Sequence, residues 1–190
     1  MPLIIGTTIL ILSILFMVIR IEAQRNNTME RKYSIRPIHE GYLYELAEFD
    51  SSEDEDSLYE LLRPEYGVTS AITKVKYQAL GVFEQDKIVG YCIYAITNKS
   101  RLLIKFVTET NSLDRKDDIA NAMIYQVKEY SMMGPQKITA IHIPISNIQM
   151  IRCFGNNGFR QMSRIKNHFK NPTEDSILMQ YQVLPNGRTL

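Results

Sequence analysis

The segment from Leu3 to Ile19 (LIIGTTILILSILFMVI) carries no charged residue. As an α-helix rising about 1.5 Å per residue it would span roughly 26 Å, slightly less than the roughly 30 Å hydrocarbon core of a bilayer. A helix this uniformly apolar offers no polar face to solvent, which disfavours a core helix of a small domain. A cleaved signal peptide is disfavoured because no Lys or Arg precedes the segment. We therefore favour a single-pass membrane anchor over residues 1–23 and keep the other two interpretations as alternatives.

The basic residues near this segment all follow it: Arg20, Arg25, Arg31 and Lys32. The positive-inside rule then places the C-terminal part on the cytosolic or matrix side of a membrane. The mitochondrial inner membrane and the endoplasmic reticulum both satisfy this expectation. Residues 24–31 are polar and aperiodic, which is typical of a linker. Residues 32–190 are left as one globular domain.

Charge is balanced along the chain, with 22 Lys and Arg against 21 Asp and Glu in 190 residues and a formal net charge of +1. A protein that binds nucleic acid through its phosphates needs a clear cationic excess, so no nucleic-acid partner is expected. The two cysteines, Cys92 and Cys153, lie far apart and lack metal-ligand spacing. Neither a metal motif nor a P-loop or dinucleotide fingerprint is present in the sequence.

Hydrophobic periodicity divides the domain into alternating strands and helices. Strands are predicted at 32–36, 77–84, 87–96, 102–108, 137–143, 159–165 and 176–183, and helices at 37–49, 58–62, 113–132 and 147–157. Pro37 is expected to end the first strand, and Gln85-Asp86 to form a hairpin turn. The acidic segment 50–57 is interpreted as a solvated loop or a helix start. It could attract a basic substrate, although a plain polar loop is the favoured interpretation. This order predicts an α/β fold with a mixed, mostly antiparallel sheet and helices on both faces.

Two motifs give the domain a family resemblance. The segment SNIQMIRCFGNNGF at 146–159 resembles the N-x-x-A-I-x-x-Y-x-x-x-G-F motif of the GNAT acetyltransferase superfamily, and DKIVGY at 86–91 resembles its G-x-I-V-G hairpin. The resemblance extends from Tyr33 to Val183. The segments HIPISN at 142–147 and KNHFK at 166–170 are most similar to N-terminal acetyltransferases of the NatE and RimI types, whereas ELAEF at 45–49 is similar to diamine acetyltransferases.

The resemblance implies acetyl-CoA as the acyl donor. Its pyrophosphate would be held by a R/Q-x-x-G-x-G/A segment at a helix N-terminus, where free N–H groups and the helix dipole favour an anion. The matching segment is 115–120, in which Arg115 and Ala120 fit the motif and Asp118 replaces its first glycine. An acid there weakens an anion site, although acids in a first helical turn also stabilise the helix by about 0.3–1 kcal/mol. The implied cofactor-binding residues are Arg115, Lys116, Asp118, Ile119, Ala120, Asn147 and Phe154.

The resemblance also assigns the chemistry. His142 coincides with the histidine that serves as base in NatE-type enzymes, although a hydrogen-bonded structural histidine is an equal alternative. The family's strand-four tyrosine falls on Leu103 or Ile104, and the tyrosine that protonates the leaving thiolate falls on Phe154. The paired tyrosines that hold a substrate N-terminus fall on His168 and Phe169, which are therefore predicted to bind substrate.

Two functions remain as hypotheses. The first is a membrane-anchored N-acetyltransferase that moves acetyl from acetyl-CoA to a primary amine, either a protein N-terminus or a small amine. The second is a catalytically inactive GNAT domain that serves as an accessory subunit of a membrane protein complex, such as a mitochondrial inner-membrane assembly. The departures at Asp118, Phe154 and Leu103 or Ile104 favour the second, while Gly90, Gly158 and Phe159 keep the fold of the family.

Overall fold

The computed structural model describes residues 32–50, 58, 69–70, 73–74, 76–109, 113–184 and 189. The predicted anchor and the linker at 24–31 lie outside these residues. So do most of the acidic segment and all but Leu58 of the helix predicted at 58–62. Within the described ranges, no helix is both long and apolar enough to cross a membrane.

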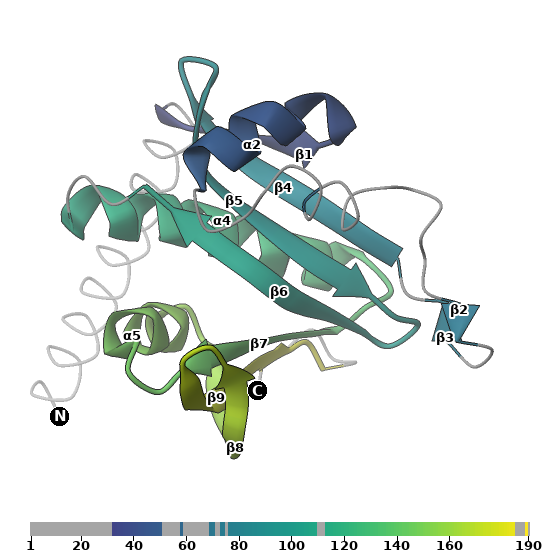
Figure 1. The fold of residues 1–190 in the computed structure, drawn as a ribbon. Helices are drawn as coiled ribbons and strands as arrows, with labels where there is room; N and C mark the ends of the chain where they lie inside the picture. The colour runs from purple at the N-terminus through teal and green to yellow at the C-terminus, as the bar shows by residue number, and fades with distance from the viewer. Residues whose placement is uncertain are drawn as a thin grey trace, which may run out of the picture.

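Seven strands form one sheet in the order β1-β4-β5-β6-β7-β9-β8 (Figure 1). Their bounds are β1 Ser34–Ile38, β4 Lys76–Glu84, β5 Lys87–Ile96, β6 Ser100–Thr108, β7 Ile138–Pro144, β8 Arg160–Lys170 and β9 Thr173–Gln182. The short strands β2 (Thr69–Ser70) and β3 (Thr73–Lys74) pair separately. Within the large sheet only β6 and β7 are parallel neighbours. The predicted mixed, mostly antiparallel sheet is confirmed.

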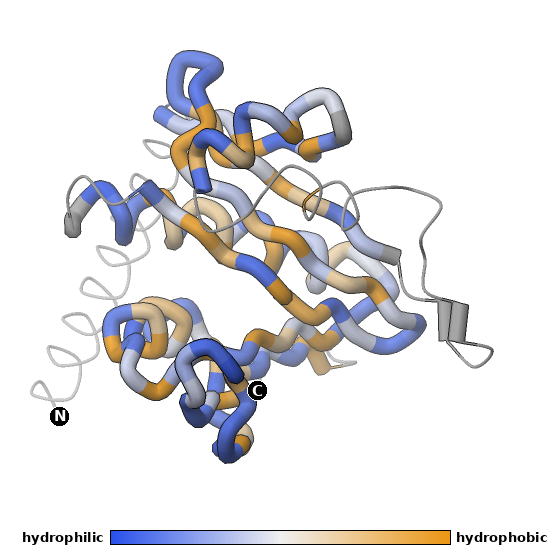
Figure 2. The backbone as a smooth tube through the Cα atoms, in the orientation of Figure 1, coloured by the Kyte–Doolittle hydropathy of each residue, from blue (hydrophilic) through white to orange (hydrophobic). Residues whose placement is uncertain are grey.

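Helices cover both faces of this sheet (Figure 1). The short helix η1 (Glu40–Tyr42) and α2 (Leu43–Phe49) lie on one face, and α4 (Leu113–Met133) and α5 (Ile148–Asn156) lie on the other. The central strand β5 is buried from both sides, because every residue between Lys87 and Ile96 is buried, and along the tube in Figure 2 its orange stretches alternate with pale ones. Its Cys92 and Tyr94 pack in the cluster beneath α4, whereas Tyr91 and Ile93 pack in the cluster beneath α2.

The prediction that Pro37 ends the first strand was wrong. Pro37 lies inside β1 and stands opposite Leu80 of β4. Because β1 is at the edge of the sheet, a residue without an N–H donor can point its nitrogen away from the neighbouring strand without breaking a ladder hydrogen bond. The helical stretch therefore starts only at Glu40.

The C-terminal hairpin is longer than predicted, since β8 continues to Lys170 and β9 begins at Thr173. Its pairing is irregular between Ile165 and Phe169, where Asn167 has a positive φ of 50°. Nearly all side chains of β8 are exposed, and Figure 2 shows this end of the sheet as mostly hydrophilic. The alternation that marks a half-buried strand is therefore missing there, which explains the short prediction.

Gly90 permits α4 to lie close to the sheet. A Cβ atom at this position of β5 would stand 2.7 Å from Ile119 Cγ2 of α4 and 3.1 Å from the backbone oxygen of Val107. The backbone oxygen cannot move without disturbing β6. Gly90 thus sets how closely the first turns of α4 approach β5.

Gly90→Ala should therefore lower the free energy of unfolding by about 1–3 kcal/mol, the usual cost of overpacking a core. The measurement is chemical denaturation of the two proteins side by side. Gly155→Ala is the matched control, because nothing lies within 4 Å of its added Cβ and alanine favours the helix α5. Equal stability of Gly90→Ala and the unsubstituted protein would contradict this account of the packing.

Candidate active site

The strands β6 and β7 are hydrogen-bonded to each other only at their beginnings. Their parallel pairing joins Ser100–Leu103 to Ile138–Ile141 and then stops. At that point β6 has a bulge, because Ile93 of β5 faces Lys105 and Tyr94 faces Leu103, which leaves Ile104 as the extra residue. A bulge bends its strand and increases its twist. Because β7 stays paired with β9 as far as Pro144, β6 and β7 diverge from Ile104 and His142 onward.

His142 stands where the two strands part. Its neighbours Ile141 and Ile143 pack in the cluster beneath α4, so the alternation of β7 directs His142 to the other face. Its Nδ1 lies 3.2 Å from the hydroxyl oxygen of Ser176, a fully buried residue of β9. Burial lowers the pKa of His142, and the neighbouring His168 lowers this pKa further. His142 is therefore the neutral imidazole at pH 7 and can accept a proton.

His168 lies directly on His142, with ring centroids 4.1 Å apart and planes inclined by 16°. Phe169 meets His168 edge to face at 5.0 Å. The structure thus brings together the predicted base and both predicted substrate-binding residues.

Asp175 holds this arrangement in place. It accepts hydrogen bonds from the backbone N–H of Asn167 at 2.9 Å and from Arg164 Nε at 2.7 Å. The Asn167 N–H, and then Arg164, lower the pKa of the Asp175 carboxyl. The carboxylate thereby fixes the irregular turn of β8 that presents His168 to His142.

The residues of the predicted pyrophosphate segment are dispersed around the first turns of α4. Arg115 Nη2 lies 2.6 Å from Glu84 Oε2 and 2.9 Å from Glu109 Oε2. Asp118 faces Lys32 at 3.9 Å, while the neighbouring Asp117 accepts a hydrogen bond from Gln149 of α5 at 3.1 Å. Two carboxylates thus engage Arg115, and the aspartates have partners of their own. Lys116 is half-buried.

The backbone donors lie earlier in the chain than the motif suggests. Because α4 begins at Leu113, its first four N–H groups, which lack an intrahelical partner, precede Asp117. Ile119 and Ala120 are buried in the core, with exposed fractions of 0% and 2%. Acids in the first turns stabilise an early helix start. Any anion would therefore meet the amides before Asp117 rather than those of Asp118, Ile119 and Ala120.

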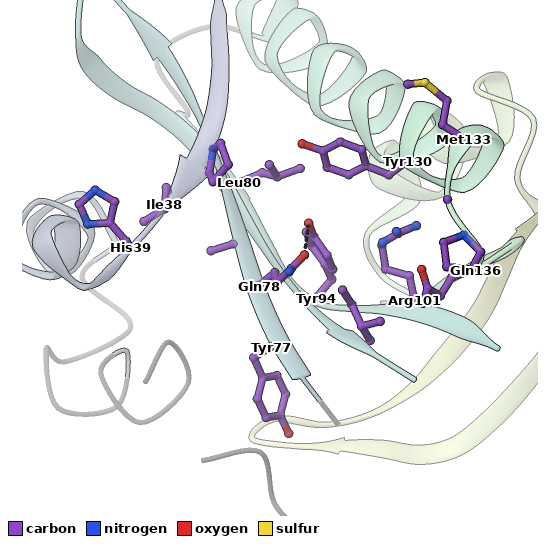
Figure 3. A pocket seen from close by; sticks show the side chains of 15 residues that line it. Ile38, His39, Tyr77, Gln78, Leu80, Tyr94, Arg101, Tyr130, Met133 and Gln136 are labelled. Atoms are coloured by element: carbon purple, nitrogen blue, oxygen red, sulfur yellow. Dashed lines mark hydrogen bonds between the residues drawn. The ribbon is translucent and has the colours of Figure 1, made fainter. Parts of the chain in front are cut away.

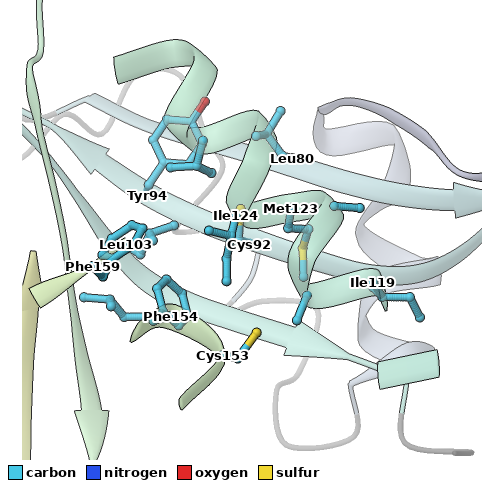
Figure 4. Packing of buried hydrophobic residues seen from close by; sticks show 14 of the residues in the cluster. Leu80, Cys92, Tyr94, Leu103, Ile119, Met123, Ile124, Cys153, Phe154 and Phe159 are labelled. Atoms are coloured by element: carbon cyan, nitrogen blue, oxygen red, sulfur yellow. The ribbon is translucent and has the colours of Figure 1, made fainter. Parts of the chain in front are cut away.

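Phe154 and Asn147 have structural roles. Phe154 is fully buried and packs edge to face against Phe106 at 5.2 Å. It also meets Phe159 edge to face at 4.9 Å (Figure 4). Leu103 belongs to the same cluster, whereas Ile104 is 44% exposed. Asn147 caps α5 by accepting a hydrogen bond from the backbone N–H of Met150 at 3.1 Å, as its place in the sequence suggests.

A buried ion pair on the same face as His142 escaped the sequence analysis. Lys105 Nζ lies 2.9 Å from Asp50 Oδ2, and the Tyr91 hydroxyl donates to the same oxygen at 2.7 Å. Asp50 is only 8% exposed, so its assignment to a solvated loop was wrong. The sequence did hold a signal for this ion pair at Lys105. A single lysine inside the apolar strand LLIKFVT needs an acid as partner when it is buried. Ser176 had no such signal.

Comparisons with known proteins define the fold. No profile of a known protein family matches the sequence. No curated protein matches it either. Similar solved structures do exist. NAA60 from Arabidopsis thaliana, in complex with a bisubstrate analogue, superposes with a TM-score of 0.66 at 15% identity, over 82% of this chain and 99% of that one.

Two bacterial enzymes support the same conclusion. The spermidine/spermine N-acetyltransferase SpeG from Vibrio cholerae gives a TM-score of 0.63 at 15% identity, over 80% of this chain and 93% of that one. The ribosomal-protein-S18-alanine N-acetyltransferase from Escherichia coli gives 0.60 at 12% identity, over 78% and 92%. The chain therefore has the fold of the GNAT N-acetyltransferases, as its motifs indicate.

His168→Ala should raise the pKa of His142 toward its ordinary value, since it uncovers one face of the ring and removes the electrostatic effect of His168. An NMR titration of the imidazole signals measures this directly. Phe169→Leu is the control, because it leaves both histidines in place. An unchanged or lower pKa of His142 in His168→Ala would contradict the electrostatic coupling of the two rings.

Proposed function

We propose that this protein is an acetyl-CoA-dependent N-acetyltransferase that acetylates a primary amine. The observation that carries the proposal is the place of His142, a neutral imidazole at the point where β6 and β7 diverge in a GNAT fold. NAA60 was solved with a bisubstrate analogue, and the two bacterial enzymes are named for acetylation of an alanine of ribosomal protein S18 and of spermidine or spermine. The place of His168, stacked on His142 and in edge-to-face contact with Phe169, favours a protein N-terminus, since His168 and Phe169 stand where the family has the pair that holds a substrate N-terminus.

His142 would act as the proton acceptor. When its Nδ1–H donates to Ser176, Nε2 keeps a lone pair that can take the proton of the attacking amine. Acetyl-CoA supplies the acetyl group as a thioester. A positioned general base typically contributes a factor of about 10²–10⁴ to the rate. Ser176 is a positioning residue, because its contact with Nδ1 orients the ring of His142.

Acetyl-CoA fits the free edges of β6 and β7 better than it fits the N-terminus of α4. The facing edges of β6 and β7 beyond Leu103 and Ile141 are unpaired with each other, which suits an extended amide-containing chain such as pantetheine. At the N-terminus of α4, a pyrophosphate must compete with Glu84 and Glu109 for Arg115. This competition, and the absence of a hydroxyl at Phe154, favour the second candidate function, an inactive accessory subunit of a membrane protein complex.

His142→Gln separates the two functions when binding and turnover are measured on the same samples. In an enzyme, acetyl-CoA at about a hundredfold above Kd should stabilise both the unsubstituted protein and the variant by about 2.7 kcal/mol. Acetylation of a peptide N-terminus should fall by about 10²–10⁴ in kcat in the variant alone. Activity of the unsubstituted protein should decline on the acid side only below the ordinary histidine pKa of about 6.5, because the pKa of His142 is lowered.

His39→Gln is the matched control, since His39 lies between β1 and η1, away from His142, and its substitution should leave kcat unchanged. Full activity of His142→Gln would remove His142 from the mechanism. If millimolar acetyl-CoA does not raise the melting temperature, the proposal of an enzyme is wrong and the accessory subunit becomes the favoured function.

We also propose that residues 1–23 anchor the domain in a membrane, with the domain on the cytosolic or matrix side. The support is the uncharged segment Leu3–Ile19 and the basic residues that follow it. Full-length protein should remain with membranes after alkaline extraction, and residues 24–190 should be released. Leu12→Arg, which places a charge near the centre of the segment, should release the full-length chain as well. Retention of the truncated protein would contradict the anchor.

A further inference from the structure

A hollow lies at the opposite end of α4 from Arg115. It is a cavity of about 700 Å³ between the C-terminal turn of α4 and strands β1, β4, β5 and β6. Because α4 has 21 residues and rises about 1.5 Å per residue, its two ends are roughly 30 Å apart. The lining is mainly apolar and aromatic, with Ile38, Leu80, Ile96, Tyr77, Tyr94 and Tyr130 among its residues (Figure 3).

Arg101, near the start of β6, also lines this cavity, although only 5% of the residue is exposed. Its guanidinium lies 5.5 Å from the ring of Tyr94 and 5.7 Å from the ring of Tyr130. Figure 3 shows the three side chains converging from β6, β5 and α4. Both distances fall within the range of a cation–π interaction.

The hydrogen bonds of Arg101 are incomplete. Nη1 donates to the hydroxyl of Ser131 at 3.2 Å, and Ser131 is itself bonded to Thr139 and to the backbone of α4. Nε is buried and has no partner, and no contact of Nη2 with a hydrogen-bond acceptor is found among the described residues. Nor does any carboxylate in the described ranges form an ion pair with Arg101.

This pattern points to a missing acceptor. A guanidinium has five N–H donors, and a buried donor without a partner is costly. Nε–H and the adjacent Nη2 form one edge of the planar fork, the edge that receives a carboxylate through two parallel hydrogen bonds. Burial lowers the pKa of Arg101, as expected for a cation that lacks an acid nearby.

We propose that this cavity binds an organic monocarboxylate with an apolar, ring-sized body. The carboxylate would pair with the Nε and Nη2 edge of Arg101, and the body would lie against Tyr94, Tyr130 and Leu80. A monoanion fits better than a phosphate dianion, because Arg101 is the single buried cation among the described lining residues and the C-terminal carbonyls of α4 offset part of its charge.

The site is independent of acetyl transfer. His142, Ser176 and Arg115 are not among its lining residues, and it lies at the C-terminal end of α4, the opposite end from Arg115. If the protein proves to have no acetyltransferase activity, the proposal of this cavity site still stands. If the cavity site proves wrong, the proposed acetyltransferase function still stands.

Benzoate is the probe, and benzamide, which has the same shape without the charge, is its control ligand. Ligand-observed NMR on the full-length protein should show saturable binding of benzoate, with a Kd in the millimolar range or below, and at least tenfold weaker binding of benzamide. Arg101→Lys keeps a cation at the position but loses the two-pronged edge, so it should weaken benzoate at least tenfold. Arg101→Gln should abolish the preference for benzoate over benzamide. Arg160→Gln, on the exposed strand β8, should behave like the unsubstituted protein.

Melting temperatures show that each variant is folded before its affinity is compared. If Arg101→Gln does not fold, Arg101→Lys carries the test. The proposal is overturned if benzoate and benzamide bind equally, if benzoate shows no saturable binding, or if Arg101→Lys retains full affinity. Displacement of benzoate by inorganic phosphate at equal concentration would also overturn the preference for a monocarboxylate.

Discussion

The four-residue limit on the pairing of β6 with β7 shapes the whole domain. Both strands are paired along their outer sides, β6 with β5 and β7 with β9, so the sheet remains continuous while β6 and β7 separate at its centre. The bulge at Ile104 also changes which face each later residue of β6 meets. Lys105 turns toward α2 and Asp50, and Phe106 turns toward Phe154 of α5. A single extra residue therefore creates the free strand edges and sets the side chains around them.

The charged and polar contacts differ between the surroundings of His142 and the N-terminus of α4. On the side of His142 the contacts favour chemistry, because Ser176 orients the ring and His168 helps to keep it neutral. At the start of α4 they favour structure, because Glu84 and Glu109 join the ends of β4 and β6 to Arg115. Part-buried ion pairs of this kind stabilise a fold only modestly, but they must be broken before an anion can use the same arginine.

Much of the fold could be predicted from the sequence, because it depends on local signals. The apolar run of β5 and the three- and four-residue spacings of α4 mark these elements wherever they pack. Pro37 could not be placed correctly, since its tolerance in β1 depends on which edge of the strand remains unpaired. The turn at Asn167 depends on Asp175, which approaches it only after the β8–β9 hairpin has formed.

The difference between local signals and contacts made only in the folded protein also explains which parts of the candidate site could be predicted. His142, His168 and Phe169 could be found because they match a motif position by position, and the fold brings them together. The partner that orients His142 could not be found, because Ser176 has ordinary sequence surroundings and gains its role through a contact with a residue more than thirty positions away. Phe154 was recognised as a replaced tyrosine that keeps the packing, and its burial against Phe106 and Phe159 agrees with that packing role.

The two arginines at the ends of α4 show how burial and pairing together identify a binding group. Arg115 is partly exposed and held by two carboxylates, so its charge is already compensated. Arg101 is almost completely buried, yet its described contacts are one hydroxyl and two aromatic rings. A fold that needed only a clamp between β6 and α4 could use a neutral side chain at lower desolvation cost. Retaining a guanidinium with an open edge beside a cavity is therefore better explained by a carboxylate that arrives from outside the described residues than by the stability of the fold.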